Sequence, residues 1–215
     1  MTYFIGDNQI QLLRNGAEYF PALLSAIEGA TEEIYLQSYI YQEDKTGVLI
    51  GRALTDAAKR GVSVRILLDG FGSKDLSKAY INILELAGVQ VMFYRPKISP
   101  WSLKKRRLRR LHHKVAVIDG RIGFVGGINI IDDYDVPNSA PNNVPPRIDY
   151  AVRIEGKLLP VLLASVQKLW RKIAWIHLRR VNVATAKIPK LIHSANVQQH
   201  HIKAALVLRD NVLHR

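Results

Sequence analysis

The sequence predicts an α/β protein in which helices pack in layers on a substantial β-sheet. Short apolar runs rich in β-branched residues, such as residues 62–69 and 115–118, are bounded by turn residues and are typical of buried strands. Longer segments between such runs, for example residues 16–29, place apolar side chains at helical spacing. Strands that alternate with helices in this way indicate a layered α/β domain.

The predicted elements follow one another in order along the chain. Strands are expected at residues 9–14, 33–41, 62–69, 89–94, 115–118, 122–125 and 150–155, and helices at 16–29, 46–60, 76–87 and 158–175. Gly61 and Gly88 follow the second and third helices, where glycine commonly ends a helix. The apolar stripes of the first and last helices predict packing against the core of the domain.

The composition limits the class of protein. A chain of 215 residues with a hydrophobic fraction of 48% suits one globular domain of ordinary size. The absence of cysteine excludes a disulfide scaffold and thiolate metal sites. No apolar run approaches the length that a membrane-spanning helix needs, and we expect no secretory signal peptide.

The most informative stretch runs from His112 to Asn129. Side chains alternate along a strand, so His112 and Lys114 are expected on the same face, with His113 on the other. An imidazole beside an ammonium group suits chemistry on a phosphate: the imidazole attacks phosphorus, and the ammonium offsets charge on the phosphate oxygens. The Asn129 amide can donate to the same oxygens.

The other polar and glycine positions of this stretch have separate expected roles. Gly126 and Gly127 would let the backbone approach the phosphate closely. Asp119 lies seven residues after His112, and strand alternation places it on the opposite face. We therefore interpret the Asp119 carboxylate as a structural group that fixes the turn at Asp119-Gly120.

These residues together resemble the complete HKD motif of the phospholipase D superfamily. The matching pattern is His112-x-Lys114-x4-Asp119-x6-Gly126-Gly127-x-Asn129. Residues 10–16, 68–73 and 149–156 are also similar to the bacterial cardiolipin synthases, most closely those of type B, which lack transmembrane helices. The resemblance covers nearly the whole chain and implies the phospholipase D-like layered domain, a mixed β-sheet flanked by helices.

The resemblance also implies roles for individual residues. It makes His112 the nucleophile, groups Lys114 and Asp119 with it in the catalytic motif, and implies phosphate binding by Gly127 and Asn129. A carboxylate on the strand after the variable loop orients the catalytic imidazole in the superfamily, and Asp149 is the residue that matches it. No metal ion or other cofactor is expected.

The net charge of +13 is unevenly distributed. No acidic residue occurs between Glu85 and Asp119, and a second stretch without acids runs from Gly156 to Arg209. The first contains a run of basic residues before His112, namely Arg95, Lys97, Lys104, Lys105, Arg106, Arg107, Arg109 and Arg110. Such a field attracts nucleic acid or an anionic membrane surface, and charge alone does not choose between them.

Two irregular stretches flank the motif. Residues 96–111 predict a loop or short amphipathic segment, in which Trp101 among cations suits a membrane interface, stacking on a base, or packing on the domain. Residues 131–147 contain four prolines and clustered acids and predict a long irregular loop. The acids show no spacing typical of metal ligands, and neither do His193, His200 and His201.

The end of the chain resembles its beginning. Residues 204–211 look like a second copy of residues 9–15, an apolar strand that closes on Leu-Arg. We therefore expect a catalytic domain at 1–176, a connector at 177–203 and the start of a truncated second repeat at 204–215. Superfamily members with two halves carry one HKD motif in each, so this chain would need a second half or a homodimer partner.

The function expected from the resemblance is phosphatidyl transfer of the cardiolipin synthase type. A phosphatidyl group would move from phosphatidylglycerol, or a related phospholipid, to an alcohol through a phosphohistidine, on the cytoplasmic face of the bacterial inner membrane. One alternative is a homodimeric endonuclease or phosphodiesterase that uses the same residues on nucleic acid. Another is a basic lipid- or nucleic-acid-binding module without catalysis.

Overall fold

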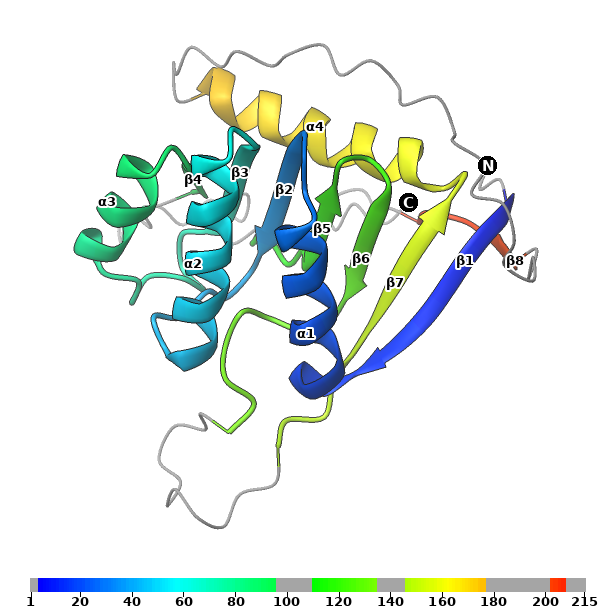
Figure 1. The fold of residues 1–215 in the computed structure, drawn as a ribbon, viewed down its shortest axis with the longest axis horizontal. Coiled ribbons are helices and arrows are strands. Elements are labelled where there is room, and N and C mark those ends of the chain that lie inside the picture. Colours follow the sequence, from blue (N-terminus) through cyan, green and yellow to red (C-terminus); the bar gives the residue numbers. More distant parts are fainter. Residues whose placement is uncertain (1–3, 96–109, 135–145, 177–201, 208–215) are drawn as a thin grey trace, which may run out of the picture.

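The computed structural model describes residues 4–95, 110–134, 146–176 and 202–207. Their strands are β1 (Ile5–Arg14), β2 (Glu33–Ser38), β3 (Ser63–Asp69), β4 (Gln90–Tyr94), β5 (Val115–Ile118), β6 (Ile122–Gly126), β7 (Tyr150–Gly156) and β8 (Ile202–Ala204). Their helices are α1 (Asn15–Glu28), α2 (Lys45–Lys59), α3 (Lys78–Leu86) and α4 (Leu159–Ile176). The order of elements along the chain is the predicted alternation (Figure 1).

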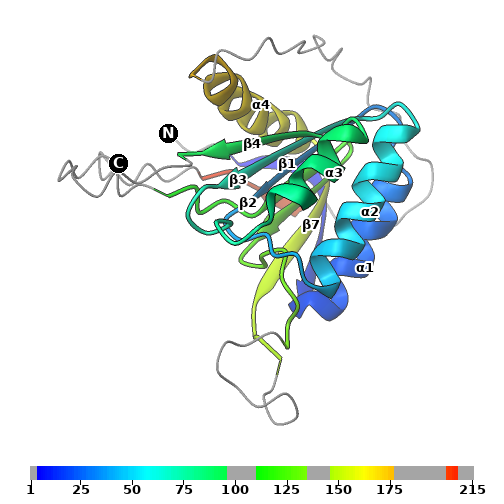
Figure 2. The same ribbon diagram turned by 90° about the vertical axis from the view of Figure 1, so that its left-hand side faces the viewer.

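The strands form one eight-stranded mixed sheet in the order β4-β3-β2-β5-β6-β7-β1-β8. β2, β3 and β4 run parallel to one another, whereas β5 pairs antiparallel with β2 and the remaining pairs are antiparallel. Helices α1, α2 and α3 cover one face of the sheet and α4 lies on the other, as Figures 1 and 2 show. The predicted α/β class with a mixed sheet between helices is confirmed.

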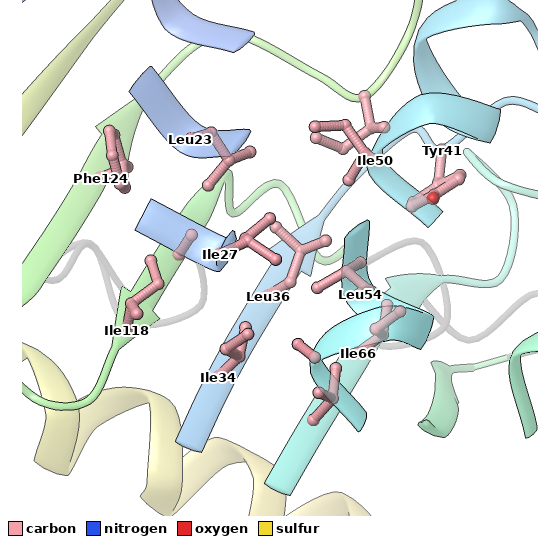
Figure 3. Packing of buried hydrophobic residues seen from close by; sticks show 14 of the residues in the cluster. Leu23, Ile27, Ile34, Leu36, Tyr41, Ile50, Leu54, Ile66, Ile118 and Phe124 are labelled. Atoms are coloured by element: carbon pink, nitrogen blue, oxygen red, sulfur yellow. The ribbon is translucent and has the colours of Figure 1, made fainter. Parts of the chain in front are cut away.

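Side-chain alternation along the strands divides the core into two clusters. Ala116 and Ile118 of β5 belong to the cluster between the sheet and α1, α2 and α3. Val115 and Val117 pack in the second cluster, under α4, around the fully buried Trp170. Figure 3 shows the first cluster, in which Leu23 and Ile27 of α1 and Ile50 and Leu54 of α2 meet the apolar side chains of the sheet.

The ends of β1 and β2 differ from the prediction for local reasons. β1 begins at Ile5, because Asp7 takes a left-handed φ of 57° and lets the strand continue around the buried Asn8. β2 ends at Ser38, because the next residues pair elsewhere: the Ile40 N–H donates to Asn129 Oδ1 at 3.0 Å, and Tyr41 forms a bridge with Ile130.

The Asn8 side chain ties β8 to the rest of the sheet. Its Nδ2 donates to the Ile202 carbonyl at 3.2 Å, and its Oδ1 accepts from the Leu158 N–H at 2.8 Å, just before α4. β8 begins two residues before the predicted strand at 204–211, whose last four residues lie outside the described part. The predictions for Trp101 and for the basic residues between positions 97 and 109, for the proline-rich part of 131–147 and for His193, His200 and His201 also lie outside it. None of the described helices has both the length and the apolar character needed to cross a membrane.

Candidate active site

A tight hairpin connects the two strands that carry the motif. Asp119 and Gly120 both have positive φ angles, 51° and 61°, and the Arg121 N–H donates to the Ile118 carbonyl at 2.9 Å. This is the geometry that an Asp-Gly pair favours between antiparallel strands. The hairpin turns at one end of these strands, so the residues before β5 and after β6 lie at the opposite end of the strands. There β2 and β3 end and β7 begins.

His112 and Lys114 meet at that opposite end of the strands. Lys114 Nζ lies 3.2 Å from both ring nitrogens of His112, and Lys114 is only 7% exposed whereas the His112 ring is open to solvent. The ring of Tyr39 lies 4.9 Å from the His112 ring and 5.3 Å from Lys114 Nζ. The predicted pairing of His112 with Lys114 on one side of the strand therefore agrees with the structure.

His113 points away from this pair, as alternation predicts. Its Nδ1 lies 3.1 Å from Gln37 Oε1, and Gln37 Nε2 in turn donates to the Val166 carbonyl of α4 at 3.3 Å. The two adjacent histidines therefore have different neighbours, and only His112 faces Lys114.

The surroundings favour a neutral His112 imidazole. Partial desolvation by nearby protein atoms and the positive charge of Lys114 lower the pKa of His112 below its ordinary value of 6.5, and Asp69 opposes them. Burial lowers the pKa of Lys114 as well, against the attraction of Asp149. A neutral imidazole has a free lone pair, which nucleophilic attack on phosphorus requires.

The Asn129 side chain is held by its oxygen. Asn129 Oδ1 accepts from the Ile40 N–H, whereas its NH2 group makes no hydrogen bond to another described residue and is available as a donor. The two glycines before Asn129 are required by close packing. A Cβ on Gly126 would overlap with Ala151 and the Tyr150 carbonyl, and a Cβ on Gly127 would overlap with the Asp149 carboxylate.

Asp149 lies next to Gly127 and is anchored by Asn15. The Asp149 N–H donates to Asn15 Oδ1 at 3.0 Å, and the Asn15 N–H donates to the Asp149 carbonyl at 2.8 Å. The Asp149 carboxylate accepts from the Tyr150 N–H and attracts Lys114 electrostatically. Within the described residues it makes no hydrogen bond to His112, so the expected orienting role remains a prediction that a direct contact does not support.

Asp119 follows β5 at the end away from His112, and its carboxylate binds the turn that precedes β2. Its carboxylate accepts from the N–H groups of Thr31, Glu32 and Glu33 at 2.8 to 2.9 Å, and from the Thr31 hydroxyl at 3.1 Å. These bonds connect the β5–β6 hairpin to the start of β2. The geometry fits the structural interpretation of Asp119 and not a group that touches the reacting atoms.

Two residues that the sequence did not single out complete the surroundings of His112. Tyr39 packs on the imidazole. Asp69 Oδ2 accepts from the Leu111 N–H at 2.7 Å, directly before His112, and its Oδ1 accepts from Phe71 and Gly72. Asp69 therefore connects the turn after β3 to the segment that carries His112.

The described residues contain no group of three or more His, Asp or Glu side chains that could hold a metal ion. The expectation of chemistry without a cofactor therefore remains a prediction.

Comparison with known proteins shows to which family the chain belongs. The family model described as "Cardiolipin synthase, PLD-like domain" matches residues 23–135, which include His112, Lys114, Asp119, Gly127 and Asn129. The chain belongs to this family. Asp149 lies beyond the matched residues.

Two curated relatives illustrate the extent of the likeness. Cardiolipin synthase B of Escherichia coli K12 is 34% identical over 223 residues, which covers 96% of this chain and 52% of that protein. Cardiolipin synthase 1 of Bacillus cereus is 38% identical over 160 residues, covering 74% of this chain and 31% of that protein. The chain thus spans about half the length of the type B relative.

Solved structures show the same fold at low identity. Nuc of Salmonella typhimurium, a phospholipase D family member, superposes with a TM-score of 0.53 at 23% identity and covers 76% of this chain and 95% of its own. The phosphatidylserine synthase of Haemophilus influenzae has a TM-score of 0.57 at 16% identity, covering 76% of this chain and 37% of its own. These likenesses confirm the phospholipase D-like fold.

Proposed function

We propose that this chain forms one half of a phosphatidyltransferase of the cardiolipin synthase type, with His112 as its nucleophile. The observation that carries the proposal is the contact of Lys114 Nζ with the solvent-accessible His112 ring at 3.2 Å. Membership of the cardiolipin synthase family supports the transfer of phosphatidyl groups as the reaction class.

In the first step, a neutral nitrogen of His112 attacks the phosphorus of phosphatidylglycerol. The N–P bond forms, the P–O bond to the leaving glycerol breaks, and the glycerol oxygen takes a proton from a general acid. The Lys114 ammonium and the Asn129 NH2 group stabilise charge on the non-bridging oxygens. The step needs no metal ion.

In the second step, the hydroxyl group of an alcohol attacks the same phosphorus. The P–O bond to the acceptor forms, the N–P bond breaks, and the hydroxyl proton passes to the base left by the first step. When the acceptor is a second phosphatidylglycerol, the product is cardiolipin. Attack by water would instead make the protein a hydrolase, so exclusion of water decides the outcome.

The general acid and base of these steps would come from a second HKD half. His112 forms the covalent bond to phosphorus, so it does not serve as that acid. This sequence contains one HKD motif, so it does not supply a second histidine of that kind. We propose that the second motif belongs to a C-terminal repeat or to a second copy of the chain. In the same proposal residues 1–176 form the catalytic domain, 177–203 a connector and 204–215 the start of the repeat.

The substrate would reach the site from an anionic membrane surface. A net charge of +13 favours such a surface, and the described helices include none long and apolar enough to span it. We propose a peripheral protein on the cytoplasmic face of the bacterial inner membrane.

The test is to trap the phosphohistidine. The protein would be incubated with phosphatidylglycerol that carries a radiolabel in its acyl chains. The reaction would then be quenched, and the label bound to the protein would be measured. His112→Gln should abolish the label, whereas His113→Gln should retain it, because the neighbouring ring faces Gln37. Undiminished labelling of His112→Gln would remove His112 from the proposed role.

A homodimeric phosphodiesterase acting on nucleic acid is the second candidate. The basic charge fits a polyanion, and the chain covers 95% of the compact phospholipase D family member Nuc. Cleavage of a labelled DNA strand with excess chelator present, together with no labelling by phosphatidylglycerol, would favour this candidate over the transferase.

A further inference from the structure

Arg110 lies next to the active site and has a donor without a partner. Its guanidinium carbon stacks 4.5 Å above the centre of the Phe71 ring, which is 44% exposed. The Lys74 ammonium also approaches this ring, at 5.6 Å. Within the described residues, Arg110 Nη1 is shielded from solvent and has no hydrogen-bond partner. A guanidinium donor without a partner is costly, so an anion that reaches this group would supply a hydrogen bond that no described residue supplies.

The backbone connects Arg110 closely to the nucleophile. Leu111, which lies between Arg110 and His112, is fixed by the bond from its N–H to Asp69. The contact between His112 and Lys114 shows that alternate residues of this segment share one side. The Cα atoms of residues two apart in an extended chain are separated by roughly 6.6 Å, so the Arg110 side chain leaves the backbone close to His112 and adds a second positive charge to this side of the segment.

The loop that carries Phe71 also packs against the site. The Ser73 hydroxyl donates to the Tyr39 carbonyl at 3.1 Å, and a Cβ on Gly72 would overlap with Tyr39. Tyr39 in turn lies against the His112 ring. Phe71 therefore holds the flat face of the Arg110 guanidinium beside the site, so that hydrogen bonds to an anion would form in the plane of the group.

We propose that Arg110 binds the phosphodiester of the acceptor lipid while the reacting phosphorus is at His112. This inference rests on the proposed function. A phosphatidylglycerol acceptor carries its own phosphate across the glycerol from the attacking hydroxyl, so the two phosphates of the product are joined by one glycerol bridge. The acceptor phosphate is therefore close to the reacting phosphorus, within reach of a long side chain that starts two residues from His112. A guanidinium matches phosphate oxygens with two parallel donors, which makes Arg110 a selector of phosphate-bearing acceptors over water or free glycerol.

The experiment compares small probes that contain one or two phosphates. Isothermal titration calorimetry at fixed ionic strength would measure the affinity of the full chain for glycerol 1-phosphate, glycerol 1,3-bisphosphate and thymidine 3′,5′-bisphosphate. The glycerol bisphosphate should bind roughly tenfold more tightly than the monophosphate, which is the effect expected of one charge-assisted contact. Arg110→Gln should abolish most of this preference and leave the affinity for glycerol 1-phosphate nearly unchanged.

Two further variants keep the test interpretable. Lys74→Gln removes a neighbouring exposed cation at the same ring, and it should retain the preference if the effect is specific to Arg110. Arg110→Lys keeps the charge but loses the planar pair of donors, and its preference should lie between those of the wild type and Arg110→Gln. Thermal unfolding of each variant would establish that it is folded.

The outcomes separate this inference from the proposed function. Binding of glycerol 1-phosphate that depends on His112, without a preference for the bisphosphate or with one that survives Arg110→Gln, would overturn the role of Arg110 alone. Binding that His112→Ala leaves unchanged would overturn both. An Arg110-dependent preference for the thymidine probe over the glycerol probe would assign the subsite to a nucleic-acid backbone and overturn the lipid acceptor.

Discussion

The carboxylate of Asp69 accepts a hydrogen bond from the backbone N–H of Leu111 at 2.7 Å, and this bond joins the end of β3 to the segment that carries His112. The other oxygen of the same carboxylate accepts from the Phe71 and Gly72 N–H groups. Asp69 is fully buried, so the three bonds form away from water. One side chain thus fixes the turn after β3 and the approach to His112 together.

We predict that Asp69→Asn slows phosphohistidine formation by about tenfold or more and lowers the free energy of unfolding by about 1 to 3 kcal/mol. The amide places a donor where two oxygens now accept, so at least one backbone N–H loses its partner. Label trapping in a single turnover would measure the rate, and urea denaturation the stability. Asp75→Asn, an exposed change in the same loop, is the matched control and should alter neither. A rate within twofold of wild type in Asp69→Asn would contradict the positioning role.

The Lys114 charge should appear in the pH dependence of the reaction. Only the neutral His112 ring attacks phosphorus, so the rate falls as the pH drops through the pKa of His112, which the site holds below 6.5. Lys114→Met removes one of the two causes that lower this pKa, so the acid limb should move to higher pH. The maximal rate should also fall, by about 10² to 10³, because a group that stabilises the phosphate oxygens is lost.

The measurement is label trapping across pH in wild type and Lys114→Met, with NMR titration of the His112 ring as an independent readout. Lys168→Met, an exposed charge on α4, is the control for a general change in net charge. A midpoint that stays in place or moves to lower pH in Lys114→Met would show that the ammonium does not govern the imidazole.

Local patterns along the chain predicted the part of the site that lies on one hairpin. The Asp119-Gly120 pair predicted the turn, and strand alternation predicted that His112 meets Lys114 while His113 faces away. These features depend on residues close in sequence, for which periodicity is sufficient. The same holds for the order of strands and helices, because each apolar run is bounded by its own turn residues.

Contacts between distant segments could not be predicted in this way. Tyr39 follows β2 and Asp69 ends β3, and nothing in either local pattern indicates contact with the segment before β5. The early start of β1 depends on Asp7, whose positive φ is rare for a residue with a Cβ atom and leaves no hydrophobic signature. Tertiary packing decides all three features, and local sequence patterns do not indicate contacts between segments that are far apart in the chain.

The four hydrogen bonds of Asp119 predict a large effect on stability. Asp119→Ala should lower the free energy of unfolding by about 2 to 4 kcal/mol, because three backbone N–H groups at the start of β2 lose a charged acceptor. Asp119→Asn keeps one oxygen and tolerates the positive φ, so its loss should be smaller. Chemical denaturation would give the stability. The amount of trapped phosphohistidine per folded molecule should be unchanged, and a loss of trapping in a fully folded variant would make Asp119 part of the chemistry.

Gly127 should tolerate no side chain. A Cβ there would overlap with the Asp149 carboxylate. Asn15 holds the Asp149 backbone through both its N–H and its carbonyl group, so β6 or Asp149 must move. We predict that Gly127→Ala costs about 1 to 3 kcal/mol of stability and lowers the trapping rate, since Asn129 is displaced with the strand end. Gly6→Ala, with no atom within 4 Å of the added Cβ, is the control and should leave both quantities near wild type. Equal behaviour of the two variants would show that the close approach at Gly127 has no consequence.

The Asn129 side chain allows its structural and chemical contributions to be separated. Its Oδ1 accepts from the Ile40 N–H, and its NH2 group is the part we assign to the substrate phosphate. Asn129→Asp keeps an acceptor for Ile40 but replaces the donor with a negatively charged oxygen. We expect it to retain most of its stability and lose about 10² to 10³ in the trapping rate. Asn129→Ala removes both groups, so it should lose about 1 to 2 kcal/mol of stability as well, because the Ile40 N–H has no acceptor. Urea denaturation and single-turnover trapping on both variants test this, and a trapping rate for Asn129→Asp equal to wild type would mean that the amide does not contact the phosphate.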